Sequence, residues 1–144
     1  MVLFAKPARH PLRLPRILAL AVVFVWFFAG GLGHFFLTDF FVKIVPPYIP
    51  LPLLAVYASG VVELLGAVGL LVPRTRAIAG VGLILLTLCV TPANVYMWMH
   101  AERFPAFSPS LLAGRLVLQV LLIACIWWST RPEPRELLRM RAGL

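Results

Sequence analysis

"YASGVVELLGAVGLLVP", residues 57–73, is an apolar run that contains one charged residue, Glu63, near its middle. A run of this kind is typical of a membrane-spanning helix, which needs about 20 predominantly apolar residues. A carboxylate inside such a helix is expensive and is almost always paired or faces the interior of a helix bundle. Glu63 therefore needs a polar partner, and the rest of the chain must supply it.

Three further runs predict the same kind of helix. The chain has 144 residues, of which 62% are hydrophobic and 12% charged, whereas a soluble domain is about half apolar and a quarter charged. The apolar residues are gathered in long stretches, which predicts an all-α fold with four transmembrane helices. The predicted spans are residues 17–37, 53–72, 77–98 and 111–128. They fill the chain, so we expect residues 1–144 to form a single membrane domain, a polytopic four-helix bundle.

The basic residues predict how the bundle is oriented. Of the 13 Lys and Arg residues, ten lie in the N-terminal tail, the 73–76 turn or the C-terminal tail, and only Lys43 and Arg103 lie in the other two connections. Cytoplasmic segments carry an excess of Lys and Arg, so both termini are expected in the cytosol, with the chain in a cell (bacterial cytoplasmic) membrane. The net charge of +8 then reflects topology, and the expected partner is the lipid bilayer rather than nucleic acid.

The connection between the first two spans, residues 38–52, is proline-rich and apolar. Thr38 or Asp39 is expected to cap a short helix that runs to Val45. The four prolines between residues 46 and 52 then favour extended backbone. We expect this segment in the membrane interface, either as a plain connector or as a lid over the mouth of the bundle.

Each span places its polar side chains on one face. Residues three, four and seven apart share a helix face, which groups Glu63 with Ser59, Gly60, Gly66 and Ala67, opposite a Leu/Val face. Small residues let helices approach closely, so Glu63 is expected to face protein. The predicted interior polar cluster, which is also the candidate ligand site, comprises His34, Glu63, Thr91, Asn94, Arg115 and Gln119, with Ser59 and Tyr96 at the pocket rim.

Arg115 is the expected partner of Glu63, because it is the other strongly charged residue within a span. A hydrogen-bonded pair removes much of the cost that each charge has alone. His34, Asn94 or Gln119 is expected to share the remaining hydrogen bonds. Two interpretations stay open: a structural clamp that sets the helix register, or a site for a ligand, a proton or redox chemistry.

Other side chains are expected to have milder roles. The aromatic run at residues 24–28 is expected to face lipid, and Cys89 and Cys125 are expected to be free thiols. No second His or Cys stands at ligand spacing from His34, so the sequence predicts no metal site.

Three motifs, in order, resemble the DoxX-like family of small four-helix membrane proteins: "GLGHFF" (31–36), "SGVVELLGAVGLLVPRTR" (59–76) and "TPANVYM" (91–97). The resemblance covers roughly residues 15–130, and Glu63 occupies the glutamate position of that family. It implies a compact bundle in a cytoplasmic membrane. Members of the family are linked to thiosulfate:quinone oxidoreduction, to membrane-bound redox-defence assemblies and to receptor-assembly chaperoning.

Two functions follow as expectations. The first is a redox-associated membrane subunit that binds a quinone or another lipophilic ligand and has a membrane or soluble redox partner. The second is an assembly factor or scaffold for a protein partner, in which the polar cluster is purely structural; a homo-oligomer fits either function. The chain has no cysteine pair and no pair of histidines suited to haem, which favours a protein without independent catalytic activity.

Overall fold

The computed structural model describes residues 13–131, which form five α-helices, one short 3-10 helix and no strand. Residues 1–12 and 132–144, which hold most of the two tails expected in the cytosol, lie outside the described residues. In chain order the elements are α1 (Leu14–Phe36), α2 (Thr38–Ile44), α3 (Pro52–Leu71), α4 (Arg76–Met99), η1 (Ala101–Arg103) and α5 (Pro109–Thr130).

The four long helices confirm the spans predicted from hydropathy, and their ends agree with the predicted ones to within three residues. Each helix is long and apolar enough to cross a membrane, which indicates a membrane protein. A proline stands in the first turn of α1, α3 and α5. The fixed φ of proline suits this position, where its missing N–H is not needed.

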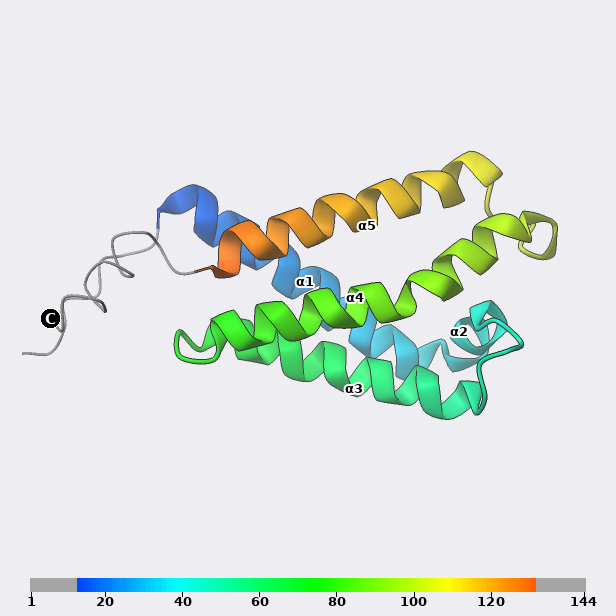
Figure 1. The fold of residues 1–144 in the computed structure, drawn as a ribbon, viewed down its shortest axis with the longest axis horizontal. Helices are drawn as coiled ribbons and strands as arrows, with labels where there is room; N and C mark the ends of the chain where they lie inside the picture. Colours follow the sequence, from blue (N-terminus) through cyan, green and yellow to red (C-terminus); the bar gives the residue numbers. More distant parts are fainter. Residues whose placement is uncertain (1–12, 132–144) are drawn as a thin grey trace, which may run out of the picture.

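The long helices alternate in direction and form a bundle (Figure 1). α1 packs against α3 and α5, and α4 packs against the same two helices. The start of α1, the α3–α4 turn and the end of α5 lie at one end of the bundle, here called the turn end. The short helix α2 and the α4–α5 connection lie at the other end, here called the α2 end.

Arginine side chains cap the carboxyl ends of two helices at the turn end. The last carbonyls of a helix have no partner within the helix and favour positive charge. Arg16 donates from Nε to the carbonyl oxygen of Ser129 (2.8 Å), and its Nη2 also bonds the carbonyl of Arg131. Arg76 donates from Nε to the carbonyl oxygen of Leu70 (2.9 Å) across the tight 73–76 turn.

Glycines let α1 and α3 approach closely. A Cβ added at Gly60 would lie 2.7 Å from His34 Cβ and 3.2 Å from the carbonyl oxygen of Gly31. A Cβ at Gly31 would in turn lie 3.1 Å from the carbonyl oxygen of Gly60. This contact confirms that the small-residue face of α3 packs against protein, with Glu63 on it.

Two packed apolar clusters fill the two ends of the bundle. The larger cluster lies toward the turn end and includes Phe27, which is 3% exposed. The smaller cluster lies at the α2 end and joins α2 to α4, α5 and the connection between them. The buried members of the larger cluster are Leu20, Val23, Phe27, Ala67, Leu70, Leu83, Leu122 and Ile126, and those of the smaller are Ile44, Met97, Phe104 and Leu112.

The 38–52 connection lies at the α2 end of the bundle, and its capping differs from the prediction. Leu37 is the N-cap of α2 and offers no side-chain hydrogen bond. Thr38 instead donates to the carbonyl oxygens of His34 (2.8 Å) and Phe35 (3.1 Å). The hydroxyl is therefore used to cover the exposed carboxyl end of α1, and the short helix ends at Ile44.

Candidate functional site

A cavity of about 1070 Å³ lies between the two apolar clusters. It is lined by all four long helices, by Phe41 and Ile44 of α2, and by Val45 and Ile49 from the segment that follows α2. Most of its lining is apolar, and the polar side chains on it are His34, Ser59, Glu63, Thr87, Asn94, Arg115 and Gln119, together with the thiol of Cys89.

His34, near the end of α1, is held in one orientation by a backbone carbonyl and an aromatic ring. Its Nδ1 lies 2.9 Å from the carbonyl oxygen of Val56, and its ring stacks on Phe41 with centroids 4.0 Å apart. A carbonyl can only accept, so Nδ1 carries a hydrogen and donates it. Ser59 donates to the same carbonyl (2.9 Å). The other ring nitrogen, Nε2, then faces Glu63.

Glu63 lies on α3 between His34 and the backbone of α1. Its Oε1 is 3.6 Å from His34 Nε2. Its Oε2 is buried and has no hydrogen-bond partner among the described residues. A Cβ added at Gly30 would lie 2.8 Å from Oε2, so a larger residue at that position would require the carboxylate to shift.

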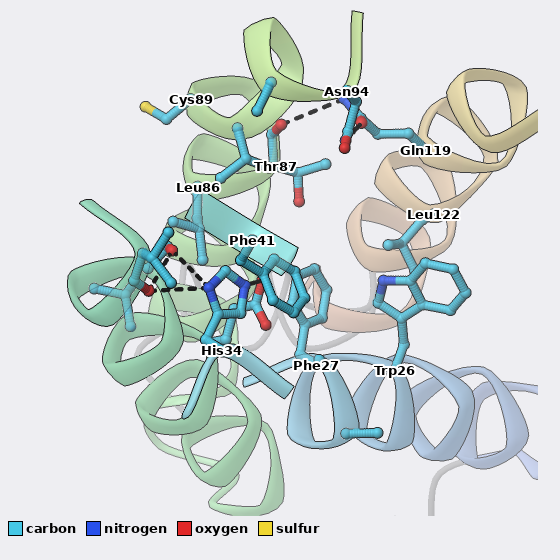
Figure 2. A pocket seen from close by; sticks show the side chains of 18 of the residues that line it. Trp26, Phe27, His34, Phe41, Leu86, Thr87, Cys89, Asn94, Gln119 and Leu122 are labelled. Atoms are coloured by element: carbon cyan, nitrogen blue, oxygen red, sulfur yellow. Dashed lines mark hydrogen bonds and ion pairs between the residues drawn. The ribbon is translucent and has the colours of Figure 1, made fainter. Parts of the chain in front are cut away.

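A second polar group joins α4 to α5. Asn94 Nδ2 donates to Gln119 Oε1 (2.6 Å), and Gln119 Nε2 bonds Thr91 Oγ1 (2.5 Å) and the carbonyl oxygen of Thr87 (3.3 Å). Thr91 also donates to the Thr87 carbonyl (2.8 Å). Figure 2 shows the Asn94–Gln119 pair on a different side of the cavity from His34. The polar side chains thus form two separate groups, one on α1 and α3 and one on α4 and α5.

The expected Glu63–Arg115 pair is not formed. The carboxylate of Glu63 faces His34, while Arg115 Nη1 donates to the thioether sulfur of Met97 at 3.4 Å. Helical periodicity placed both charges on inward faces, and both do line the cavity. The prediction fails because α1 inserts His34 beside Glu63, while Arg115 extends toward the α2 end, where Met97 is buried.

Of the remaining predicted site residues, two lie at the cavity and one does not. Ser59 lines the cavity as expected, and Thr91 reaches the site through its bond to Gln119. Tyr96 does not line the cavity: its hydroxyl accepts from Arg103 Nη1 (2.6 Å) and its ring lies beside His100. Tyr96 points into the α4–α5 connection because it is offset from the face that carries Thr87, Thr91 and Asn94.

The sequence did not predict several residues that line the cavity. The aromatic run at 24–28 does not face lipid throughout, since Phe27 is a core residue and Trp26 lines the cavity at 45% exposure. The sequence places Phe41 only within the proline-rich interfacial connection, whereas the structure places it on the cavity wall. A three-residue spacing from Trp26 to Ala29 and from Leu18 to Ala21 could have indicated a second inward face on α1.

No three His, Cys, Asp or Glu side chains within residues 13–131 are grouped so as to hold a metal ion. Cys89 and Cys125 are both free. A mainly apolar cavity with a few fixed polar groups suits an organic molecule, which the apolar walls would hold and the polar groups would orient.

The fold and the cavity define a class: a bundle of four helices able to span a membrane, with a large cavity between the helices that carries ionisable side chains. The chain belongs to the family described as Domain of unknown function (DUF8561), whose model matches residues 20–130. The match runs from within α1 to the last residue of α5 and includes both polar groups. Comparison with curated proteins and with solved structures gave no match.

Proposed function

We propose that the chain is a DoxX-like, multi-pass protein of a cytoplasmic membrane that holds a lipophilic molecule with a polar head group in its cavity. A quinone and a membrane lipid are the candidate ligands. The observation that carries the proposal is the position of the cavity, between two packed clusters and against both polar groups. Ionisable residues within transmembrane segments are costly, and they mark ligand sites or transport pathways by default.

The size of the cavity supports an amphiphile. Ligand pockets for small molecules have volumes of about 300–1,000 Å³, and this cavity, at about 1070 Å³, lies just above that range. It has room for a head group at the polar side chains and for part of an apolar chain. A small polar solute would leave most of the apolar wall uncovered.

Access from the bilayer is supported by the lining of the cavity along α1. Leu18, Val22 and Val25 line the cavity and are also 57%, 60% and 61% exposed on the surface of the bundle. A residue that both lines the cavity and is exposed lies at an opening of the cavity. In a membrane this opening faces the hydrocarbon region, from which a lipophilic molecule would enter.

The orientation belongs to the proposal as well. The excess of Lys and Arg in the two tails and the 73–76 turn favours a cytosolic turn end. The α2 end, which lies closer to the polar side chains of the cavity, then faces the opposite side. In a redox assembly the chain would act as a membrane subunit beside a membrane or soluble partner and would need no catalytic centre of its own.

The alternative is an assembly factor or scaffold in which the polar cluster only holds the bundle together. It is supported by the Asn94–Gln119–Thr91 group, whose hydrogen bonds join α4 directly to α5. Such bonds between transmembrane helices stabilise packing without any ligand.

Native mass spectrometry of protein purified from its own membrane distinguishes the two functions. We expect a stoichiometric small molecule on the wild type, its loss from Leu86→Trp, and its retention by Leu85→Trp. Leu86 lines the cavity, whereas its neighbour Leu85 is 56% exposed and does not. An empty cavity with a stoichiometric protein partner would overturn the proposal in favour of the scaffold.

A further inference from the structure

Arg115 carries a charge that no acidic side chain of the cavity neutralises by contact. It lines the cavity within α5, and the hydrogen bond that the structure gives it runs from Nη1 to the sulfur of Met97 at 3.4 Å. A thioether is a weak acceptor, and a guanidinium has five N–H donors. The other donors of Arg115 thus have no protein acceptor among the described residues.

Among residues 13–131, Glu63 is the one acidic residue that lines the cavity, and its carboxylate faces His34. His34 donates from Nδ1 to the Val56 carbonyl, which leaves Nε2 directed at Glu63 Oε1. The carboxylate of Glu63 thus faces His34 and makes no ion pair with Arg115.

Arg115 is therefore a cation on the cavity wall that no acidic side chain contacts by a hydrogen bond or ion pair. Met97 and Leu112, which are 1% and 3% exposed, belong to the cluster that closes the α2 end. Arg115 reaches toward this cluster through its bond to Met97 and is partly buried. A cation on a mainly apolar wall is unfavourable without a hydrogen-bonding partner, and a ligand can supply the anion.

We infer that the cavity binds an amphiphile with an acidic head group, a carboxylate or a phosphate, and that Arg115 holds that head group. The inference rests on the proposed function and names the chemistry of its ligand. A guanidinium matches a carboxylate or phosphate with two parallel N–H···O bonds. Asn94, on the neighbouring helix, has a second amide hydrogen beyond the one bonded to Gln119. The apolar chain of the ligand follows the α1 wall at Val22 and Val25 toward the opening.

The test compares ligands that differ only in the head group. The purified chain in nonionic detergent is titrated with oleate, oleyl alcohol, oleylamine and 1-oleoyl lysophosphatidate, and binding is followed by native mass spectrometry and by thermal shift. We expect the wild type to bind oleate, lysophosphatidate or both at least about tenfold more tightly than the alcohol or the amine, because charge-assisted hydrogen bonds are about twice as strong as neutral ones. Which of the two acids binds more tightly identifies the head group.

Variants test whether Arg115 is the source of the preference for an acidic head group. Arg115→Gln is expected to abolish it, and Arg115→Lys to retain part of it. Arg103→Gln is the matched control, because Arg103 is an exposed arginine that bonds Tyr96 outside the cavity, and it should keep the full preference. If Arg115→Gln does not fold, the comparison of the four ligands on the wild type still tests whether the cavity prefers an acidic head group.

The outcomes separate the inference from the proposed function. If all four probes bind equally and Leu86→Trp binds none of them, the inference of an acidic head group would be overturned. The cavity would then remain a ligand site, as the proposed function states. Retention of the acid preference by Arg115→Gln would also overturn the inference. Binding of no probe by the wild type, with no native ligand present, would overturn both.

Discussion

His34 on α1 and Glu63 on α3 face each other with Nε2 3.6 Å from Oε1, beside the close approach of the two helices at Gly31 and Gly60. The His34 ring is fixed from behind by the Val56 carbonyl and the Phe41 ring. The pair is therefore built into the packing of α1 on α3. Its stability effects can be separated from those of Arg115, which belongs to a different pair of helices.

Replacing one member of the His34–Glu63 pair should be worse than replacing both. His34→Phe leaves the Glu63 carboxylate buried without its partner, and breaking a buried pair in this way costs about 3 kcal/mol or more. The double variant His34→Phe/Glu63→Leu should recover most of that loss. Glu63→Gln should cost less than about 1 kcal/mol, because its amide can donate to Nε2. The measurement is the free energy of unfolding in mixed micelles. Strict additivity of His34→Phe and Glu63→Leu in the double variant would contradict the pairing.

Glu63 and Arg115, in contrast, should act independently on stability. They share no hydrogen bond or ion pair, and changes at sites that share no partner usually add within about 0.5 kcal/mol. We expect the unfolding free energies of Glu63→Gln, Arg115→Leu and the double variant to be additive within that margin. A coupling above about 1 kcal/mol would mean that the two side chains meet in solution, as the sequence alone suggested.

The Gly60 position should not tolerate even one methyl group. A Cβ there meets His34 Cβ at 2.7 Å and the Gly31 carbonyl oxygen at 3.2 Å, and the nearest of these atoms belongs to a side chain held by its own contacts. Overpacking of this kind costs about 1–3 kcal/mol, so Gly60→Ala should lower the melting temperature. Gly82→Ala is the control, since nothing lies within 4 Å of its added Cβ. It should be neutral or stabilising by up to about 1 kcal/mol, because alanine favours the helix.

The long helices could be predicted because hydropathy and length decide them almost alone. The inward face of α3 was also predictable, since the Gly and Ala spacing marks it, and Glu63 is 9% exposed. The partner of Glu63 was not. Periodicity gives the face of a helix but neither its crossing angle nor its height against its neighbours. His34 reaches Glu63 only because Gly30, Gly31 and Gly60 bring α1 and α3 together.

Gln119 should be the main polar link between α4 and α5. It accepts from Asn94 and bonds Thr91 and the Thr87 carbonyl. Hydrogen bonds between transmembrane helices average about 0.6 kcal/mol and reach about 1.7 kcal/mol, so Gln119→Leu should cost about 1–2 kcal/mol of unfolding free energy. Leu121→Ala, at a 61% exposed position on the same helix, should cost less. An unchanged stability in Gln119→Leu would remove the structural role and assign these bonds to ligand positioning.

Val22 should control the rate at which a ligand enters the cavity. It lines the cavity, is 60% exposed and stands between Leu18 and Val25 along the opening. In Val22→Trp the larger side chain narrows the opening without entering the core, so association of anthroyloxy-labelled stearate in stopped flow should slow at least about tenfold, a barrier increase of about 1.4 kcal/mol. Ile17→Trp is the control, because Ile17 is 46% exposed on the same helix and does not line the cavity. Equal rates in wild type and Val22→Trp, at equal final occupancy, would place the entrance elsewhere, and the α3–α4 side at Val62 and Cys89 would then be the route to test.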